Sequence, residues 1–114
     1  MGIITKEKPL AYSNFVFKWY IMNDLNKELT RELVIKSQLG IHARPSAMIA
    51  KIAQKASDMI WIIKDDQKVE ASSIIDILTL ACAEGDCITL EAKNHDDLDK
   101  INEIANLIEE GFGE

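Results

Sequence analysis

An α+β fold, with a four-stranded antiparallel sheet that carries three helices on one face, is what this sequence of 114 residues predicts. From residue 29 onward, segments with the apolar alternation of strands and segments with the apolar spacing of helices follow one another in the order βαββαβα. Split βαβ connections of this kind produce an antiparallel sheet with its helices on one side. An apolar share of 47% is enough for the core of one small domain.

The first strand and the first helix flank a short connection that contains Gly40. Residues 31–37 alternate apolar and charged side chains, which predicts a half-buried strand. Pro45 marks the start of a helix, because the N–H that it lacks has no partner in a first helical turn. We expect this helix to reach about Ala56, with its apolar side chains on one face and its lysines on the other.

A β-hairpin and a shorter helix are predicted next. Residues 59–64 (MIWIIK) indicate a well-buried strand, residues 65–66 a turn, and residues 68–71 a short return strand. Either residue of the serine pair 72–73 is suited to cap a second helix that reaches about residue 81.

The last strand and the last helix complete the pattern. Apolar residues alternate with polar ones between residues 88 and 92, which predicts a strand. Asn94 followed three residues later by Asp97 resembles a capping box, and the apolar residues from 98 to 108 have helical spacing. Gly111 is the expected stop of this helix.

Composition and charge exclude several classes of protein. The net charge of −6 leaves no basic field that would gather nucleic acid. Cys82 and Cys87 have neither the number nor the spacing of a disulfide framework or zinc site. His95 is expected to be a solvated residue at a helix start, and the aspartates after it suit a helix N-terminus electrostatically. No stretch approaches the roughly 20 apolar residues of a membrane span. We therefore expect a cytoplasmic protein without membrane insertion, bound metal or cofactor.

Residues 1–28 differ from the rest of the chain. They hold most of the aromatic residues and show no sustained helical or strand period, so we place a domain boundary near Leu29 and the domain over residues 29–114. The segment is either a tail that packs on the domain through its aromatic residues or an extension without structure of its own. Met22 would also serve as a natural start, which would make residues 1–21 a start-site artefact.

The stretch Leu39–Pro45 (LGIHARP) places an imidazole and a guanidinium at the predicted start of a helix. The unpaired N–H groups of a first turn and the positive end of the helix dipole favour a phosphate there. The neutral ring of His42 is a nucleophile that can attack phosphorus, and Arg44 would stabilise the negative charge that results. The alternative is an ordinary surface or capping histidine.

Gly40–Pro45 (GIHARP) resembles the active-site signature of the HPr family, the histidine phosphocarriers of the bacterial phosphoenolpyruvate-dependent phosphotransferase system. Residues 29–114 resemble this family without a gap, and the predicted order of elements agrees with its open-faced β-sandwich. The resemblance implies a carrier rather than an enzyme, which accepts a phosphoryl group from enzyme I and donates it to IIA-type proteins in sugar uptake or a regulatory relay. We expect a monomer.

The resemblance assigns roles to single residues around the signature. His42 matches the phosphorylated histidine, which the family modifies on Nδ1, Arg44 matches the arginine that stabilises the phosphoryl group, and Pro45 starts the first helix. Leu39 is a departure, since many members that serve sugar uptake have Asn, Ser or Thr at this position.

Further roles fall on the second helix. Ile74, Ile75 and Leu78 resemble the apolar patch that docks against enzyme I and IIA-type proteins. Ordinary core packing is the alternative for Ile74 and Leu78. Ser73 falls where many members have a regulatory serine that a dedicated kinase phosphorylates. Asp76 would repel a phosphate on Ser73, which favours a helix cap instead.

Three pairs or runs of residues are similar to the nitrogen-related NPr branch of the family: Leu39-Gly40, Glu70–Ser73 (EASS) and Gly111-Phe112. That branch implies a regulatory relay rather than sugar uptake. A regulatory binding module that acts through its docking surface without phosphotransfer is the alternative function, and the His42–Arg44 pair argues against it. An unrelated small enzyme would need a second catalytic group near His42, which the sequence does not offer.

Overall fold

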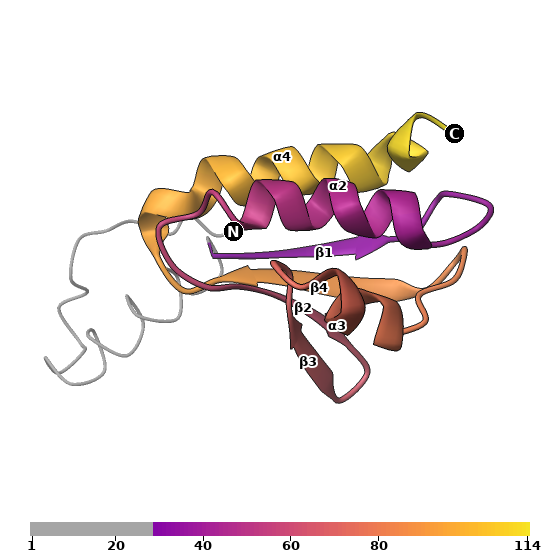
Figure 1. The fold of residues 1–114 in the computed structure, drawn as a ribbon, viewed down its shortest axis with the longest axis horizontal. Helices are drawn as coiled ribbons and strands as arrows, with labels where there is room; N and C mark the ends of the chain where they lie inside the picture. Colours follow the sequence, from indigo (N-terminus) through magenta and orange to yellow (C-terminus); the bar gives the residue numbers. More distant parts are fainter. Residues whose placement is uncertain (1–28) are drawn as a thin grey trace, which may run out of the picture.

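The computed structural model describes residues 29–114, which adopt the predicted βαββαβα order with two short 3-10 turns added (Figure 1). The strands are β1 (Thr30–Val34), β2 (Ile60–Lys64), β3 (Gln67–Glu70) and β4 (Cys87–Ala92). The helices are α2 (Ala43–Ala53), α3 (Ile74–Thr79) and α4 (Leu98–Glu109), with the turns η1 (His95–Asp97) before α4 and η2 (Gly111–Gly113) after it. The predicted N-terminal segment, residues 1–28, lies outside the described residues.

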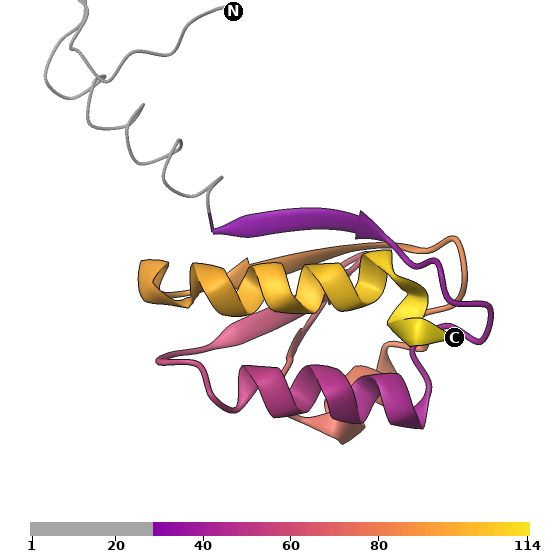
Figure 2. The same cartoon turned by 90° about the horizontal axis from the view of Figure 1, so that it is seen from above.

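The four strands form one antiparallel sheet in the order β1-β4-β2-β3, which confirms the predicted fold class. The two central strands are therefore β4 and β2, and Ile62 pairs with Leu90 where they meet. The helices pack on one face of this sheet, with α2 and α4 side by side (Figures 1 and 2). The other face carries no helix of the described domain.

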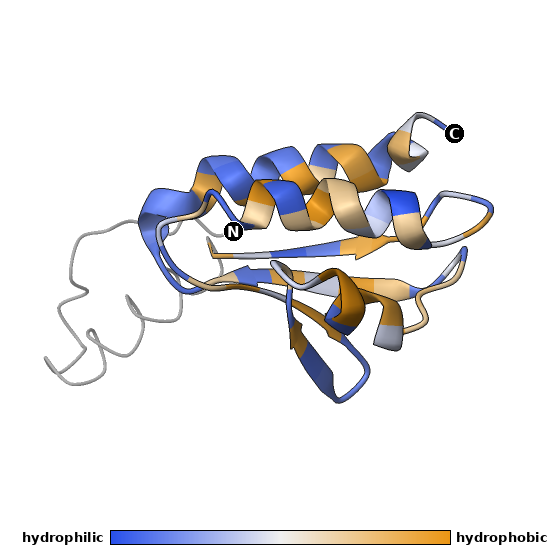
Figure 3. Cartoon of the chain, in the orientation of Figure 1, coloured by the Kyte–Doolittle hydropathy of each residue, from blue (hydrophilic) through white to orange (hydrophobic). Residues whose placement is uncertain are grey.

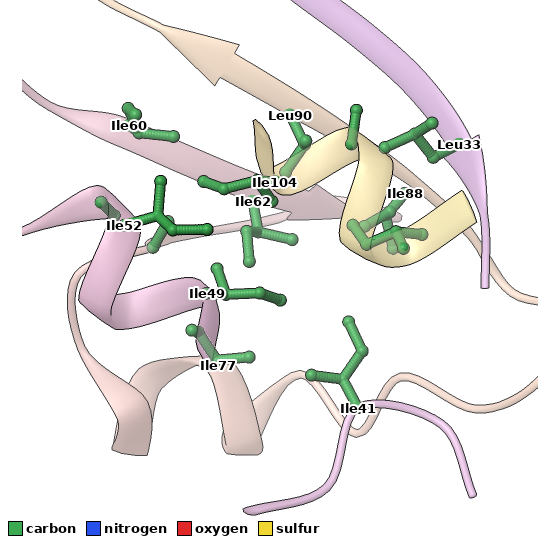
Figure 4. Close-up of a cluster of buried hydrophobic side chains, with 14 of the residues drawn as sticks. Leu33, Ile41, Ile49, Ile52, Ile60, Ile62, Ile77, Ile88, Leu90 and Ile104 are labelled. Atoms are coloured by element: carbon green, nitrogen blue, oxygen red, sulfur yellow. The ribbon is translucent and has the colours of Figure 1, made fainter. Parts of the chain in front are cut away.

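The core lies between the sheet and the helices. Apolar and polar residues alternate along α2 and α4 as predicted (Figure 3), and the apolar ones meet the inner residues of the strands. Isoleucine dominates this cluster (Figure 4): Ile49 and Ile104 on the helices and Ile62 on β2 have no exposed surface. β-branched side chains suit the pleated surface of a sheet and lose little freedom when packed there.

The element boundaries differ from the prediction by a few residues. β1 ends at Val34 rather than at residue 37, because Ile35 pairs with the loop before β4: its N–H donates to the Asp86 carbonyl at 2.9 Å. The chain then turns, and the Ser37 hydroxyl donates to the Gly40 carbonyl at 2.8 Å. α2 begins at Ala43, which places Pro45 inside the first turn instead of at its start.

The predicted capping box at the start of the last helix does not form. Asn94 does accept a hydrogen bond from the Asp96 N–H at 2.8 Å, but Asp97 does not complete a capping box. Its carboxylate is buried and accepts the N–H groups of Ser57 at 2.7 Å and Asp58 at 3.0 Å. Asp97 therefore ties the connection between α2 and β2 to the start of α4.

Replacing Asp97 by alanine is expected to lower the free energy of unfolding by about 2 kcal/mol, because two backbone donors lose a charged acceptor. Urea unfolding followed by circular dichroism measures this loss. Asp96→Ala is the matched control, since Asp96 is exposed and should cost about 0.5 kcal/mol or less. Equal losses in the two variants would contradict the role given to Asp97.

Candidate functional site

A tight turn at Gly40 sets the approach of the chain to α2. Gly40 has a φ of +69°, and a Cβ atom at this position would lie 2.2 Å from the Cys82 carbonyl oxygen. The same carbonyl accepts the N–H of Ile41 at 3.0 Å, so the turn is fastened to the segment that follows α3. Only glycine combines this backbone conformation with so close an approach. Ile41 is thereby fixed in the core (Figure 4), and His42 follows it at the surface.

His42 is the N-cap residue of α2 and uses only its backbone for this purpose. Its carbonyl accepts the Ser46 N–H at 2.9 Å, while its side chain makes no capping hydrogen bond. The ring is 36% exposed. It therefore lies at the positive end of the helix dipole with room for a reacting group.

Glu114 completes the site from the far end of the chain. Its Oε2 atom lies 2.7 Å from His42 Nε2 and 3.3 Å from Arg44 Nη2. Arg44 Nη2 also donates to the Phe112 carbonyl at 3.0 Å, which fastens turn η2 beside the first turn of α2 (Figure 2). Phe112 is buried and has a φ of +59°. Glu114 was not among the residues predicted for the site, although the glycines on both sides of Phe112 signal a tight turn.

The contact with Glu114 distinguishes the two ring nitrogens of His42. A carboxylate is an acceptor, so the tautomer that suits this contact carries its proton on Nε2. Nδ1 then keeps the lone pair, and among residues 29–114 it has no hydrogen-bond partner. A neutral imidazole nitrogen with a free lone pair is a nucleophile. The Arg44 guanidinium and the helix N-terminus supply positive charge for an anion bound there.

The hydrogen bond with His42, supported by Arg44, holds the pKa of the Glu114 carboxyl below its usual value of 4.5. A carboxyl group whose pKa is lowered in the folded state contributes stability above its unfolded pKa and loses it as the pH falls through the folded value. We therefore expect the contact to persist down to about pH 4.5 and to break below it.

NMR titration of the Glu114 side-chain carboxyl measures the midpoint, which should lie below 4.5 and rise in His42→Ala. A midpoint at or above 4.5 in the unaltered chain would show that the contact does not form in solution.

The predicted docking residues lie on the surface of α3. Ile74 is 39% exposed, Ile75 73% and Leu78 40%, so the alternative of core packing is wrong for Ile74 and Leu78. Four of the six residues of α3 are hydrophobic (Figure 3), and the helix packs against α2, whose first turn follows His42. Leu39, 72% exposed, adds a further apolar side chain three residues before His42.

Ser73 is the N-cap residue of α3, and its hydroxyl oxygen accepts the Asp76 N–H at 3.2 Å. This geometry is that of the predicted helix cap. Residues 29–114 bring no three His, Cys, Asp or Glu side chains together in a way that would hold a metal ion. Every helix in this part of the chain is too short or too polar to span a bilayer.

Comparison with known proteins gives one family. The family model described as the PTS HPr component phosphorylation site matches residues 29–110. A phosphocarrier protein HPr of Neisseria meningitidis is 33% identical over 86 residues, which cover 75% of this chain and 97% of that protein. A phosphocarrier protein NPr of Shewanella violacea is 31% identical over 87 residues, which cover 76% and 96%.

Solved structures agree with these relatives. The crystal structure of HPr-C-His from Thermoanaerobacter tengcongensis has a TM-score of 0.70 and 39% sequence identity to this chain. The matched part covers 75% of this chain and 96% of that one. The similarity therefore extends over the whole described domain.

Proposed function

Because the chain belongs to the HPr family, the phosphocarriers of the bacterial phosphotransferase system, we propose that His42 Nδ1 is the atom that carries the phosphoryl group. The donor is enzyme I charged by phosphoenolpyruvate, and the acceptors are IIA-type proteins. The observation that carries this proposal is the placement of His42 at the start of α2, with Nε2 on Glu114 and with no hydrogen-bond partner for Nδ1 among residues 29–114.

The proposed transfer is a displacement at phosphorus. Nδ1 of His42 uses its lone pair to form the new N–P bond while the bond between phosphorus and the donor breaks. The proton stays on Nε2, where Glu114 accepts it in a hydrogen bond at 2.7 Å and stabilises the positive charge of the ring. Transfer to an acceptor runs the same steps in reverse, with the acceptor's nucleophile attacking phosphorus.

The charges around His42 suit a phosphoryl group that is bound only briefly. Arg44 and the N-terminus of α2 attract the phosphoryl oxygens, whereas the Glu114 carboxylate, 3.3 Å from the same guanidinium, repels them. Stabilisation is therefore partial, and the phosphoryl group remains transferable. A carrier needs this balance, because a fully stabilised phosphohistidine would not be passed on.

Intact-mass spectrometry of the chain mixed with enzyme I, magnesium and phosphoenolpyruvate tests the proposed function. We expect a single added phosphoryl group that is labile in acid and stable in alkali. Enzyme I preparations from both the sugar and the nitrogen-related branches are needed, since an HPr and an NPr are similar to this chain to nearly the same degree. No modification by either preparation would overturn the proposal.

The exposed residues Ile74, Ile75 and Leu78 of α3 are proposed as the docking patch for these partners. An apolar patch beside a reactive side chain can dock a partner and place its reacting group in line with phosphorus. The exposures of these residues support this role, because soluble proteins rarely leave three neighbouring large apolar side chains uncovered.

Ile75→Glu is expected to raise the KM of enzyme I for this chain about 10-fold or more, because docking would have to bury a charge that has no partner. Stability should hardly change, because Ile75 is 73% exposed and glutamate is favourable in a first helical turn. Val34→Glu, an exposed apolar residue on β1, is the matched control and should leave the KM unaltered. Steady-state phosphorylation rates measure both, and an unchanged KM in Ile75→Glu would contradict the patch.

A further inference from the structure

The face of the sheet that is turned away from the helices is apolar in its middle. β2 places buried isoleucines on its inner side, yet its outer positions Trp61 and Ile63 are apolar as well and only half-buried. Val34 of β1 and Cys87 of β4 pair with each other on the same outer side, and both are exposed. A strand covered on one side alternates apolar and polar residues, whereas a continuous apolar run is typical of a strand covered on both. We call these four residues the outer patch.

Two shallow hollows mark the ends of the outer patch. One, of about 360 Å³, lies beside Trp61, Glu91 and Leu29, where the described chain begins. The other, of about 250 Å³, lies among Val34, Ile63 and Cys87. An apolar segment that enters at the first hollow could run along the face to the second.

We propose that the aromatic segment of residues 10–22 (LAYSNFVFKWYIM) of this chain covers the outer patch. The chain joins the face at its edge, since the Leu29 carbonyl accepts the Ala92 N–H at 2.8 Å beside the first hollow. Six residues lie between Met22 and Leu29, and the seven Cα–Cα steps from one to the other reach up to about 23 Å, whereas the outermost strands of a four-stranded sheet lie only about 14 Å apart. The segment is therefore long enough to lie across the whole face.

Charge favours the same arrangement. Glu32, Glu70 and Glu91 occupy outer positions of the sheet around the outer patch. Lys68 is paired with Glu91 at 3.3 Å, and its ammonium lies 4.2 Å from the centre of the Trp61 ring. Residues 10–22 carry one lysine and no acidic residue, and residues 1–9 before them add two lysines and one glutamate. A segment of net positive charge thus meets a face of net negative charge.

A second copy of the chain is the weaker occupant. The net charge of −6 makes two copies repel each other, while the segment is tethered to the face that it would cover. A short tether gives an effective concentration in the millimolar range, which exceeds the concentration of free protein in ordinary solutions.

The two cysteines provide the test, because Cys87 belongs to the outer patch and Cys82 is buried in the core. Burial also raises the pKa of the Cys82 thiol, so this residue should not react while the domain is folded. The rate of alkylation by the neutral reagent iodoacetamide is measured for the full chain and for the triple variant F15S/F17S/W19S. Cys87 should react about 10-fold faster in the variant, because a covered thiol reacts only when its cover opens.

The matched control is N23S/D24S/N26S, which alters polar residues of the connection between that segment and Leu29 and should leave the rate unchanged. Unreactive Cys82 in each variant reports that the domain is still folded. Equal rates for Cys87 in the full chain and the aromatic variant would overturn the proposal. Protection of Cys87 that grows with protein concentration would overturn it as well and would assign the outer patch to a second copy.

Discussion

The variant His42→Gln is expected to accept no phosphoryl group from enzyme I while keeping its fold. Glutamine has an amide in place of the imidazole and offers no neutral nitrogen lone pair, so the proposed nucleophile is lost. Stability should change by about 0.5 kcal/mol or less, because the ring is partly exposed and makes no capping bond. Intact-mass spectrometry after incubation with enzyme I and phosphoenolpyruvate measures the loss, and thermal unfolding checks the fold.

His95→Gln is the matched control, since the chain has two histidines and His95 is exposed at the start of η1. This variant should be phosphorylated as fast as the unaltered chain. In the phosphorylated protein, long-range ¹H–¹⁵N spectra should place phosphorus on Nδ1 of His42. Phosphorylation of His42→Gln, or a phosphoryl group on Nε2, would contradict the roles given to the two nitrogens.

The sequence was sufficient to predict the order of elements, because β1, β4, α2 and α4 each show an apolar period over five residues or more. It was also sufficient to place His42 and Arg44 together at the start of α2, since they lie two positions apart and need no tertiary contact to come together. Ser73 as the cap of α3 is a local feature of the same kind. Predictions of this type depend on neighbours along the chain.

Glu114 and Asp97 could not be predicted in this way, because each acts on residues far away in the sequence. Glu114 reaches His42 only when η2 packs beside α2, a contact across 72 residues. Asp97 is one of several aspartates near a helix start, and burial alone separates it from its exposed neighbour Asp96. Local patterns predict where such carboxylates lie along a helix and not which of them find partners.

For a related reason, the sequence does not predict whether the side chains of Ile74, Ile75 and Leu78 are exposed or buried. A helix of six residues is too short for its apolar period to define one inner face, and α3 is apolar on most sides. Only Ile77 is buried there, so the packing against α2 determined which residues remained outside.

The second large effect is expected for Gly40→Ala, which should lower the free energy of unfolding by about 3 kcal/mol or more. The φ of +69° costs a residue with a Cβ atom about 1–2 kcal/mol. The new atom would also meet the Cys82 carbonyl oxygen at 2.2 Å, so the two backbone segments must move apart. That movement stretches the hydrogen bond from the Ile41 N–H to the same carbonyl, which adds about 1 kcal/mol.

Gly85→Ala separates the two causes of this loss. Gly85 has a φ of +90°, so alanine meets a comparable backbone cost there, but no atom lies within 4 Å of the added Cβ. Urea unfolding should therefore show a loss of about 1–2 kcal/mol for Gly85→Ala and a larger one for Gly40→Ala.

At temperatures where the variant is still folded, Gly40→Ala should also be phosphorylated more slowly, because displacement of Ile41 moves His42 away from Glu114 and the start of α2. Equal losses of stability in the two variants would mean that the turn at Gly40 changes its shape without moving the Cys82 carbonyl. The phosphorylation rate of Gly40→Ala should then equal that of the unaltered chain.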